Sequence, residues 1–470
     1  MKNILFSRFF TGFAVLSLAG CAVGPNYKAP LDPAPTQFLS TAAGASPTAT
    51  DETSLQAWWA RFHDEQLNGL VGLAMTNNLD VKSAIASIKA ARAEHRVSHF
   101  DYAPIVTANG GYNRVRETQS SVLPGADRNV DAFDASFDAT WELDIFGRVR
   151  RNNEATQADL ESVEAVRDDL LVSVTAETAR AYFELRGLLN ELNVAERNAE
   201  NQAATLDLTI KLLEGGRGTD LDVARARAQL DTTRAGIPQL KVSISKAQHR
   251  LAVLTGRGFD SLPGVGTYHP LASELPTVSL GDPAALLRRR PDIRAAERRL
   301  AAATARIGVA TADLFPRITA GGSIGLGAST LGGLGRGGAD HFSLGPNINW
   351  AFLDSPRRYQ LVKAAGARAE SQIQTYRQTV LLAIEDTENA LTEYGREQER
   401  RDFLADAVKA SDKAAALARQ RFDQGTANFL EVLDAERVKL QAEASLAASQ
   451  TQTATDLISV FKALGGGWKP

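Results

Sequence analysis

The most regular pattern in the chain is an alternation of apolar with acidic or polar residues between positions 133 and 145. The apolar members are Phe133, Ala135, Phe137, Ala139, Trp141, Leu143 and Ile145. The residues between them are Asp134, Ser136, Asp138, Thr140, Glu142 and Asp144. Because successive side chains of a β-strand point to opposite faces, this period of two predicts a strand with one apolar and one acidic face.

Three further segments repeat the alternation, at 317–326, at 342–350 and, more weakly, at 106–112. Each of the four predicted strands has about 10 residues, which is the length that crosses a bilayer when a strand is tilted. The other interpretation is a pair of amphipathic hairpins in a soluble sheet. The glycine-rich segment 332–338 and the polar segment 116–129 would then be ordinary hairpin loops.

A helical pattern fills the region from Arg148 to Glu214, where only Gly187 interrupts it and no proline occurs. At about 1.5 Å per residue this helix would be on the order of 100 Å long. Alternating steps of four and three residues connect Leu185, Leu189, Leu192, Glu196, Ala199, Ala203, Leu206, Ile210 and Leu213. This heptad spacing predicts left-handed coiled packing of helix against helix. A second long helix is predicted to begin at 354–357, with a capping residue ahead of Pro356 at the first helical position.

One pattern occurs twice in the chain. The stretch 290–294 matches the stretch 78–82 at an offset of 212 residues. Trp350 and Arg357 match Trp141 and Arg148 at an offset of 209 residues. The two copies cover roughly 64–256 and 279–467, and each reads helix, two strands, long helix, turn, helix. The predicted fold class is therefore mostly α, with long antiparallel helices and four β-strands per chain.

The N-terminus has the pattern of an export signal. Lys2 and Arg8 precede a short apolar run that is too short to span a bilayer. The run ends in Leu18-Ala19-Gly20-Cys21, which resembles the lipobox of bacterial lipoproteins, in which the cysteine is acylated. A free cysteine after an ordinary signal is the alternative. Residue 22 is alanine rather than aspartate, and this resemblance implies the outer membrane.

No later stretch has the run of about 18 apolar residues expected of a spanning helix, so any further crossing must be made by strands. Four strands cannot close a barrel, and open sheet edges cannot exist in lipid. The smallest barrels have about eight strands, so two or more copies of the chain would have to share one.

Composition and motifs give no case for an enzyme. The net charge is −3 over 470 residues, which offers no bulk attraction for nucleic acid. Ser323 lies in a G-x-S-x-G pattern, but inside a predicted strand rather than a nucleophile elbow. His95 and His99 lack the further ligands of a zinc site. The arginine run at 288–299 is interpreted as an exposed helix face or as inter-helix ion pairs. We expect no metal and no cofactor beyond a covalent lipid on Cys21.

Five stretches of the chain resemble one known family. They are Cys21–Tyr27, Trp58-Trp59 with Phe62 and Asp64, Trp141–Arg148, Arg289–Glu297, and Ala463–Trp468. Together they resemble the outer-membrane factor family, the TolC-like and OprM-like efflux ducts, in its lipoprotein branch. The resemblance covers essentially the whole mature chain, and Arg289-Arg290-Pro291-Asp292-Ile293-Arg294 is its most specific part.

The resemblance implies a homotrimer with a transmembrane twelve-stranded β-barrel that continues as an α-helical barrel across the periplasm. An equatorial domain would come from 257–285 and 395–410 plus both chain ends. The implied organisation is a signal at 1–20, a lipidated linker at 21–63, repeats at 64–256 and 279–467 around a linker at 257–278, and a tail at 468–470. Implied partners are outer-membrane lipid, a periplasmic adaptor (membrane fusion) protein and an inner-membrane pump of RND or ABC type.

The resemblance also assigns sites. The turns between paired helices would be periplasmic tips that dock the adaptor, with Gly215, Gly216, Gly218, Gly425 and Thr426 as their residues. The closed gate would comprise Leu430, Glu431, Asp434, Asp222 and Phe422. Phe422 and Ala427 replace a tyrosine and an arginine of TolC-like relatives, which puts the cross-links that lock some relatives closed in doubt. The acidic residues near the turn could instead be solvated residues of a helix N-terminus.

The strand pattern adds a site inside the barrel. If Phe133, Phe137 and Trp141 face lipid, then Asp134, Asp138 and Glu142 face the pore. The expected function is a passive exit duct for drugs or other small molecules. Two alternatives are a duct of a type I protein or peptide secretion system and a non-channel periplasmic spacer lipoprotein.

Overall fold

A computed structural model of the chain describes residues 22–30, 38–39, 45–46, 55–124, 127–258, 265–269, 275–279 and 289–468. The predicted signal at 1–20, the predicted lipid attachment at Cys21 and much of the predicted linker at 257–278 lie outside these described residues. Within the described part, no helix combines the length and the apolar character needed to cross a membrane.

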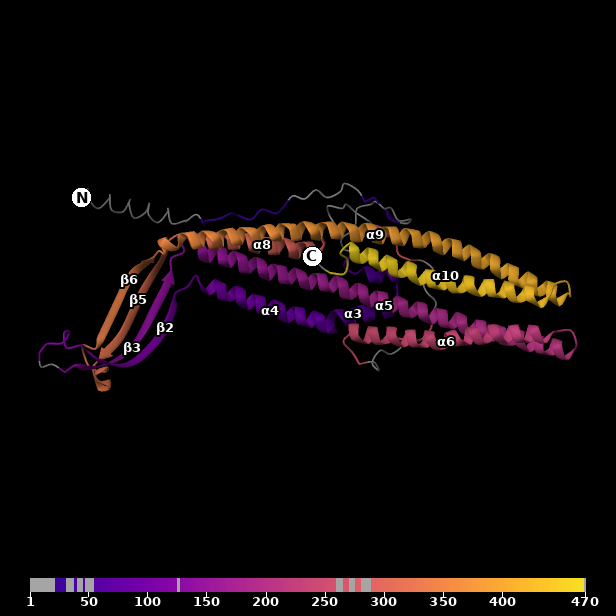
Figure 1. The fold of residues 1–470 in the computed structure, drawn as a ribbon, viewed down its shortest axis with the longest axis horizontal. Helices are drawn as coiled ribbons and strands as arrows, with labels where there is room; N and C mark the ends of the chain where they lie inside the picture. The colour runs from indigo at the N-terminus through magenta and orange to yellow at the C-terminus, as the bar shows by residue number, and fades with distance from the viewer. Residues whose placement is uncertain are drawn as a thin grey trace. The chain divides into compact units, whose positions relative to one another are not determined.

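The two copies fold into matching series of elements (Figure 1). The first copy forms α3 (Glu65–Asn77), α4 (Leu79–Phe100), β2 (Ile105–Arg116), β3 (Asn129–Glu142), α5 (Arg148–Glu214) and α6 (Asp220–Leu254). The second forms α8 (Pro291–Ala312), β5 (Arg317–Ala328), β6 (Asp340–Asn349), α9 (Ser355–Asp423) and α10 (Phe429–Ala463). The predicted order of helix, two strands, long helix, turn and helix is confirmed in both.

Short elements fill the connections. They are β1 (Ala45–Ser46), which pairs in parallel with β4 (Val278–Ser279), and the 3-10 turns η1 (Trp58–Phe62), η2 (Leu331–Gly333) and η3 (Phe352–Asp354). In the first copy the opening helix is broken in two at Asn78. The Asn78 side-chain oxygen accepts from the backbone N–H of Asp80 and Val81, and its amide donates to the Leu254 carbonyl, so the break is fully hydrogen-bonded.

Two predicted boundaries are corrected by the local hydrogen bonds. β3 ends at Glu142 although the alternation runs to Ile145, because Asp144 turns away to accept from the backbone N–H of Val149 and Arg150 at the start of α5. The expected cap of α9 is also different. Ser355, the residue before Pro356, is already helical, and both carboxylate oxygens of Asp354 accept from the Arg357 guanidinium.

The chain divides into two compact units, and each combines segments from both copies. The first unit comprises Met1–Leu31, Ser87–Glu164 and Ala295–Arg377. The second comprises Asp32–Ala86, Ala165–Arg294 and Gln378–Pro470. The first unit contains one antiparallel sheet in the order β2-β3-β5-β6, so that β2 and β6 are its edges. The second contains the largest apolar core.

Three of the motifs recognised in the sequence meet in the core of the second unit. The Trp58 ring stacks on Phe461, with centroids 5.0 Å apart. The chain end folds over this pair: a Cβ added to Gly466 would lie 2.8 Å from the Trp58 ring, so only glycine fits there. The Arg290 guanidinium donates to the carbonyl of Ala463 at 3.1 Å. These motifs therefore hold segments that are distant in the sequence together.

The Asp64 carboxylate also joins segments that are distant in the sequence. One of its oxygens accepts from the Leu67 N–H and caps α3, while the other accepts from the Tyr182 hydroxyl at 2.7 Å and from Arg186 at 2.9 Å. The end of η1 and the start of α3 are thereby fixed to α5. Burial and the hydrogen bond to Asp64 raise the pKa of the Tyr182 hydroxyl, so this tyrosine stays a donor.

The covered side of α5 towards its C-terminal end is more polar than the sequence indicated. The buried residues along it are Val194, Asn198, Ala199, Gln202, Thr205 and Thr209. Arg419 of α9 donates to the Thr205 hydroxyl, so this line faces α9. Leu185, Leu189 and Ala199 of the predicted seam are buried, whereas Glu196 is exposed. Beyond Ala199 the most covered line is displaced by one residue from the predicted seam.

Candidate functional site

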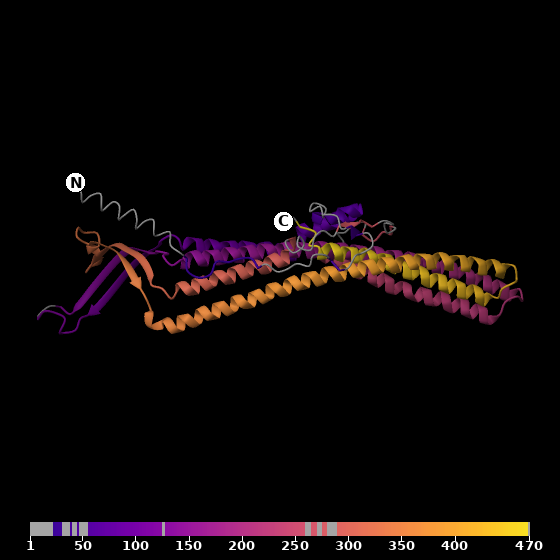
Figure 2. The same ribbon diagram turned by 90° about the horizontal axis from the view of Figure 1, so that it is seen from above.

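The two turns that join the long helix pairs have the same backbone geometry. After α5, Gly216 adopts a φ of 71° and the Arg217 N–H donates to the Leu212 carbonyl. After α9, Gly425 adopts a φ of 74° and the Thr426 N–H makes the equivalent bond, to Arg421. Both are Schellman ends, in which a glycine in the left-handed region closes the helix. The turns lie side by side at one end of the second unit (Figure 2).

The helices that leave the turns are capped by residues at matching positions. Thr219 caps α6, with Asp222 as the return partner of a capping box, and Asn428 caps α10. The predicted gate residue Asp222 therefore has a local role, because its carboxylate accepts from the backbone N–H and the hydroxyl of Thr219. Gly218 is required by its surroundings, since an added Cβ would lie 2.9 Å from the Leu213 backbone nitrogen.

Leu430 and Asp434 share one exposed face of α10, as their spacing of four residues predicts. Leu430 is 49% exposed, although it is a large apolar side chain at the end of a helix pair. The opposite side of α10 is buried through Phe429 and Val432. The structure thus presents Leu430 and Asp434 together, on a face that the rest of the described chain does not cover.

The two predicted gate carboxylates on α10, Glu431 and Asp434, each have an arginine partner that sequence reasoning missed. Asp434 accepts from Arg437 at 2.8 Å, and Glu431 lies 3.3 Å from Arg421. Both pairs are exposed, so each contributes little to stability. The i, i+3 spacing of Asp434 and Arg437 was a signal that could have revealed the first pair. The Phe422 ring contacts Phe429, with centroids 5.6 Å apart, instead of forming a hydrogen bond.

The sheet of the first unit arranges its faces in rows. Strand pairing places Ala108, Phe137, Ile324 and Phe342 in one line across all four strands. The neighbouring line consists of Thr107, Asp138, Ser323 and Ser343. Because adjacent residues of a strand point to opposite faces, the first row lies on an apolar face and the second on a polar face. Phe137, Ile324 and Phe342 are 61%, 65% and 83% exposed, so no other part of the described chain covers the apolar row.

The three predicted pore residues differ in their surroundings. Asp138 accepts hydrogen bonds from Asn109 and Ser136 on the polar face. Asp134 lies on the same strand, opposite Gly111 and Gly327. Glu142 forms two hydrogen bonds with Arg148, at 2.9 and 2.7 Å, which pair its charge at the junction of β3 and α5. Of the three, Glu142 is therefore the one whose charge is compensated.

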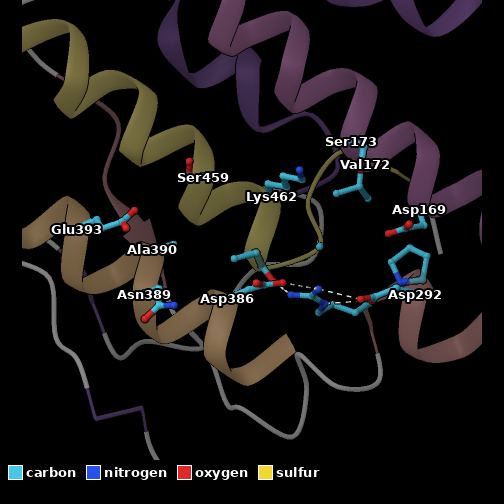
Figure 3. Close-up of a pocket in the computed structure, with 14 residues that line it drawn as sticks. Asp169, Val172, Ser173, Asp292, Asp386, Asn389, Ala390, Glu393, Ser459 and Lys462 are labelled. Atoms are coloured by element: carbon cyan, nitrogen blue, oxygen red, sulfur yellow. Dashed lines mark hydrogen bonds and ion pairs between the residues drawn. The ribbon is translucent and has the colours of Figure 1, made fainter. Parts of the chain in front are cut away.

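The most specific sequence motif lines a cavity of about 290 Å³ in the second unit (Figure 3). Arg290 donates to Asp292 at 2.8 Å and to Asp386 at 3.2 Å, so the guanidinium joins the start of α8 to α9. Burial, followed by the charge of Asp292, raises the pKa of the nearby Asp169 carboxyl. The motif acts here through inter-helix ion pairs, which is one of the two roles predicted for the arginine run.

The chemistry set aside in the sequence finds no support among the described residues. Ser323 lies within β5, opposite Asp138 and Ser343. His95 contacts the Thr156 hydroxyl at 3.1 Å, and the His99 ring packs against Tyr102. In the part of the chain that the structure describes, no group of three or more histidine, cysteine, aspartate or glutamate side chains is placed to hold a metal ion.

The sequence matches a family model for "Outer membrane efflux protein" over residues 70–257 and 283–466. Nodulation protein T from Rhizobium leguminosarum bv. trifolii is 31% identical over 472 residues, which are 99% of this chain and 98% of the relative. Outer membrane protein OprJ from Pseudomonas aeruginosa is 29% identical, with 96% of this chain and 94% of the relative covered. The solved structure of the outer-membrane channel OprN is similar with a TM-score of 0.89 and 39% identity, over 96% of this chain and 100% of that chain.

Proposed function

Because the chain belongs to the outer membrane efflux protein family, we propose that it is the exit duct of a tripartite efflux pump, assembled as a homotrimer. It is an outer-membrane transport protein and not an enzyme, and its family works without a cofactor. In the proposed assembly a periplasmic adaptor and an inner-membrane pump of RND or ABC type deliver drugs or other small molecules, which then cross the outer membrane passively.

The observation that best supports this proposal is the exposed apolar row of the sheet, which includes Phe137, Ile324 and Phe342. Burial of apolar surface stabilises a protein by roughly 25 cal/mol per Å². A row of exposed aromatic and aliphatic side chains is therefore stable only against lipid or another chain. Ten to fourteen residues per strand suffice to cross a bilayer at a tilt. The edges β2 and β6 must then pair with other copies, because an open edge in lipid leaves backbone groups without partners. Three copies of four strands give the proposed twelve-stranded barrel.

The tips and the gate extend the proposal into the periplasm. The paired turns at Gly216 and Gly425 would dock the adaptor, together with Gly215, Gly218 and Thr426. Three copies of Leu430 around the threefold axis would exclude water, and Asp434 would form an acidic ring beside them. Phe422 and Glu431 lie at the same turn, and Asp222 lies at the equivalent turn of the first copy. The Arg421 and Arg437 partners would limit the repulsion between copies of Glu431 and of Asp434.

A conductance experiment tests the gate. We expect Leu430→Ala combined with Asp434→Ala to increase single-channel conductance in planar bilayers, and to make cells sensitive to vancomycin without any pump. The matched control is Leu221→Ala, because Leu221 occupies the equivalent position in the first copy and is similarly exposed. Equal conductance in the parent and the double variant, at equal surface expression, contradicts the gate. A parent that forms no channel contradicts the duct itself.

The lipid anchor is a separate part of the proposal. The Leu18-Ala19-Gly20-Cys21 stretch, followed by Ala22, supports acylation of Cys21 and retention in the outer membrane. We expect the mature N-terminal peptide to carry a diacylglyceryl group and an N-acyl group in mass spectrometry. An unmodified Cys21, or cleavage at another residue, would contradict the anchor and leave the channel proposal standing.

A further inference from the structure

The residues immediately after Cys21 occupy a closely fitted groove in the first unit, between the start of α5 and the end of α8. Gly24 adopts a φ of 88°, and a Cβ added to it would lie 2.5 Å from the Cα of Gly308. A Cβ on Gly308 would lie 2.8 Å from the Arg151 side chain. Two glycines at one contact bring backbone against backbone, which no other residue pair would allow.

Arg151 directs its guanidinium into this segment. Its side chain is 5% exposed, and it donates to the carbonyls of Val23 and Gly24 and to the side-chain oxygen of Asn26 at 2.6 Å. Among the described residues, its one other acceptor is Glu154, at 2.8 Å. A buried guanidinium needs acceptors, because leaving a buried charge without them is strongly unfavourable. The segment supplies three of the four, so its departure would leave most of this charge unsatisfied.

Tyr27 binds the C-terminal end of the segment to α5 and α8. Its hydroxyl donates to Glu297, and its ring packs on the small residues Ala158, Ala301 and Ala302. The Arg298 guanidinium lies 5.8 Å from the ring centroid. Burial and the bond to Glu297 raise the pKa of the Tyr27 hydroxyl, so it remains protonated and keeps donating.

We propose that this groove is a dedicated binding site for residues 22–27, and that it fixes where a lipid on Cys21 enters the membrane. The placement of the lipid rests on the anchor proposed above, whereas the docking of the segment does not. The Val23 N–H donates to the Phe146 carbonyl at 3.1 Å, and a Cβ on Gly147 would overlap Ala22. Ala22, the first described residue of the segment, therefore lies at the junction of β3 and α5. Arg151, Gly308 and Glu297 act as positioning residues for the anchor.

Hydrogen exchange of the peptide that contains residues 22–30 tests the proposal in the detergent-solubilised full chain. We expect the parent and Cys21→Ser to protect these amides equally, because the groove and not the lipid holds them. Gly24→Ala and Arg151→Met should each exchange at least about tenfold faster. The matched control is Gly366→Ala, since a Cβ on this helical glycine of the same unit meets nothing within 4 Å. It should keep the protection of the parent.

Two outcomes would overturn the proposal. If Cys21→Ser exchanges as fast as Gly24→Ala, the lipid holds the segment and the groove does not. If Gly24→Ala and Arg151→Met are both as protected as the parent, the fit at Gly308 and the Arg151 bonds do not define a site. Bilayer conductance recorded on the same samples separates these outcomes from failure of the duct. Loss of docking alone should leave the sheet and the gate helices in place and the conductance unchanged, whereas failure of the duct would abolish conductance.

Discussion

At the scale of single residues, Asp456 is the carboxyl group whose surroundings oppose its charge most clearly. It is 6% exposed on α10, and among the described residues its side chain accepts a hydrogen bond only from the neutral Gln452 amide, at 2.7 Å. The facing helix α9 presents Glu393 and Glu397, of which Glu397 is paired with Arg400. Burial, with smaller contributions from these two carboxylates, raises the pKa of Asp456 to about 6.

This acid makes stability depend on pH in a defined direction. The folded chain holds the proton up to about pH 6, whereas the unfolded chain releases it near pH 4, so the stabilising contribution is complete below about pH 4 and lost as pH rises through 6. We expect Asp456→Asn to increase the free energy of unfolding at pH 8 by roughly 1–3 kcal/mol, and so to raise the melting temperature there, but to change little at pH 4. Circular dichroism melts at both values decide this. Glu399→Gln, at an exposed pair with Arg396, is the control and should show no such difference.

Gln202 is a second residue whose surroundings do not satisfy it. It is 5% exposed on α5, and within the described chain neither its amide nitrogen nor its oxygen has a hydrogen-bond partner. A buried polar group without a partner costs about 1–3 kcal/mol. We therefore expect Gln202→Leu to raise the melting temperature, while Asn201→Leu, at the exposed neighbour, should not. A lower melting temperature in Gln202→Leu would indicate that a water or another chain bonds the amide.

At the scale of elements, the two Schellman turns allow a direct comparison of glycines. Gly216 and Gly425 have positive φ and open space around them, so an added Cβ meets no atom and the whole cost lies in the backbone. We expect Gly216→Ala and Gly425→Ala each to destabilise by about 1 kcal/mol. Gly366→Ala, inside α9, should stabilise by about the same amount. Thermal melts of the three variants check the prediction, and unchanged melts for both turn variants would contradict it.

Elements with a strong local signal could be predicted from the sequence. The helix predicted from Arg148 to Glu214 is α5 to the residue, because neither a proline nor a cap interrupts a propensity that extends over many turns. The strands followed from their period of two, and the second turn followed from the offset of 209. Leu430 and Asp434 share an exposed face because their spacing matches one helical turn.

Contacts between distant segments could not be predicted in this way. Nothing in the pattern around Gly24 indicates that it meets Gly308, or that Arg151 collects the carbonyls of residues 23 and 24, because these contacts depend on how α5 and α8 pack. The buried polar line of α5 was missed for a related reason: a displacement of one residue moves a helix face by about 100°. Such a rotation depends on the helices that cover α5, which the α5 sequence alone does not specify.

At the scale of the whole molecule, the duplication and the compact units do not coincide. Each unit takes strands or helices from both copies, so neither copy can bury its apolar surface alone. The sheet shows this directly: β3 from the first copy pairs with β5 from the second, and this pairing completes the apolar and polar rows. Two hairpins, one from each copy, thus form one four-stranded sheet with β2 and β6 at its edges.

The charge of the assembled wall predicts its ion selectivity. Asp138 lies on the polar face and forms no ion pair with an arginine of the described chain. In the proposed trimer, three copies of Asp138 would therefore line the pore with uncompensated negative charge. Such a ring attracts cations. We expect reversal potentials in a salt gradient to show cation preference, and Asp138→Asn to weaken it. Glu142→Gln should weaken it less, because Arg148 already compensates that carboxylate. Anion preference in the parent would mean that the two faces of the sheet are interchanged, since a shift of one residue exchanges them.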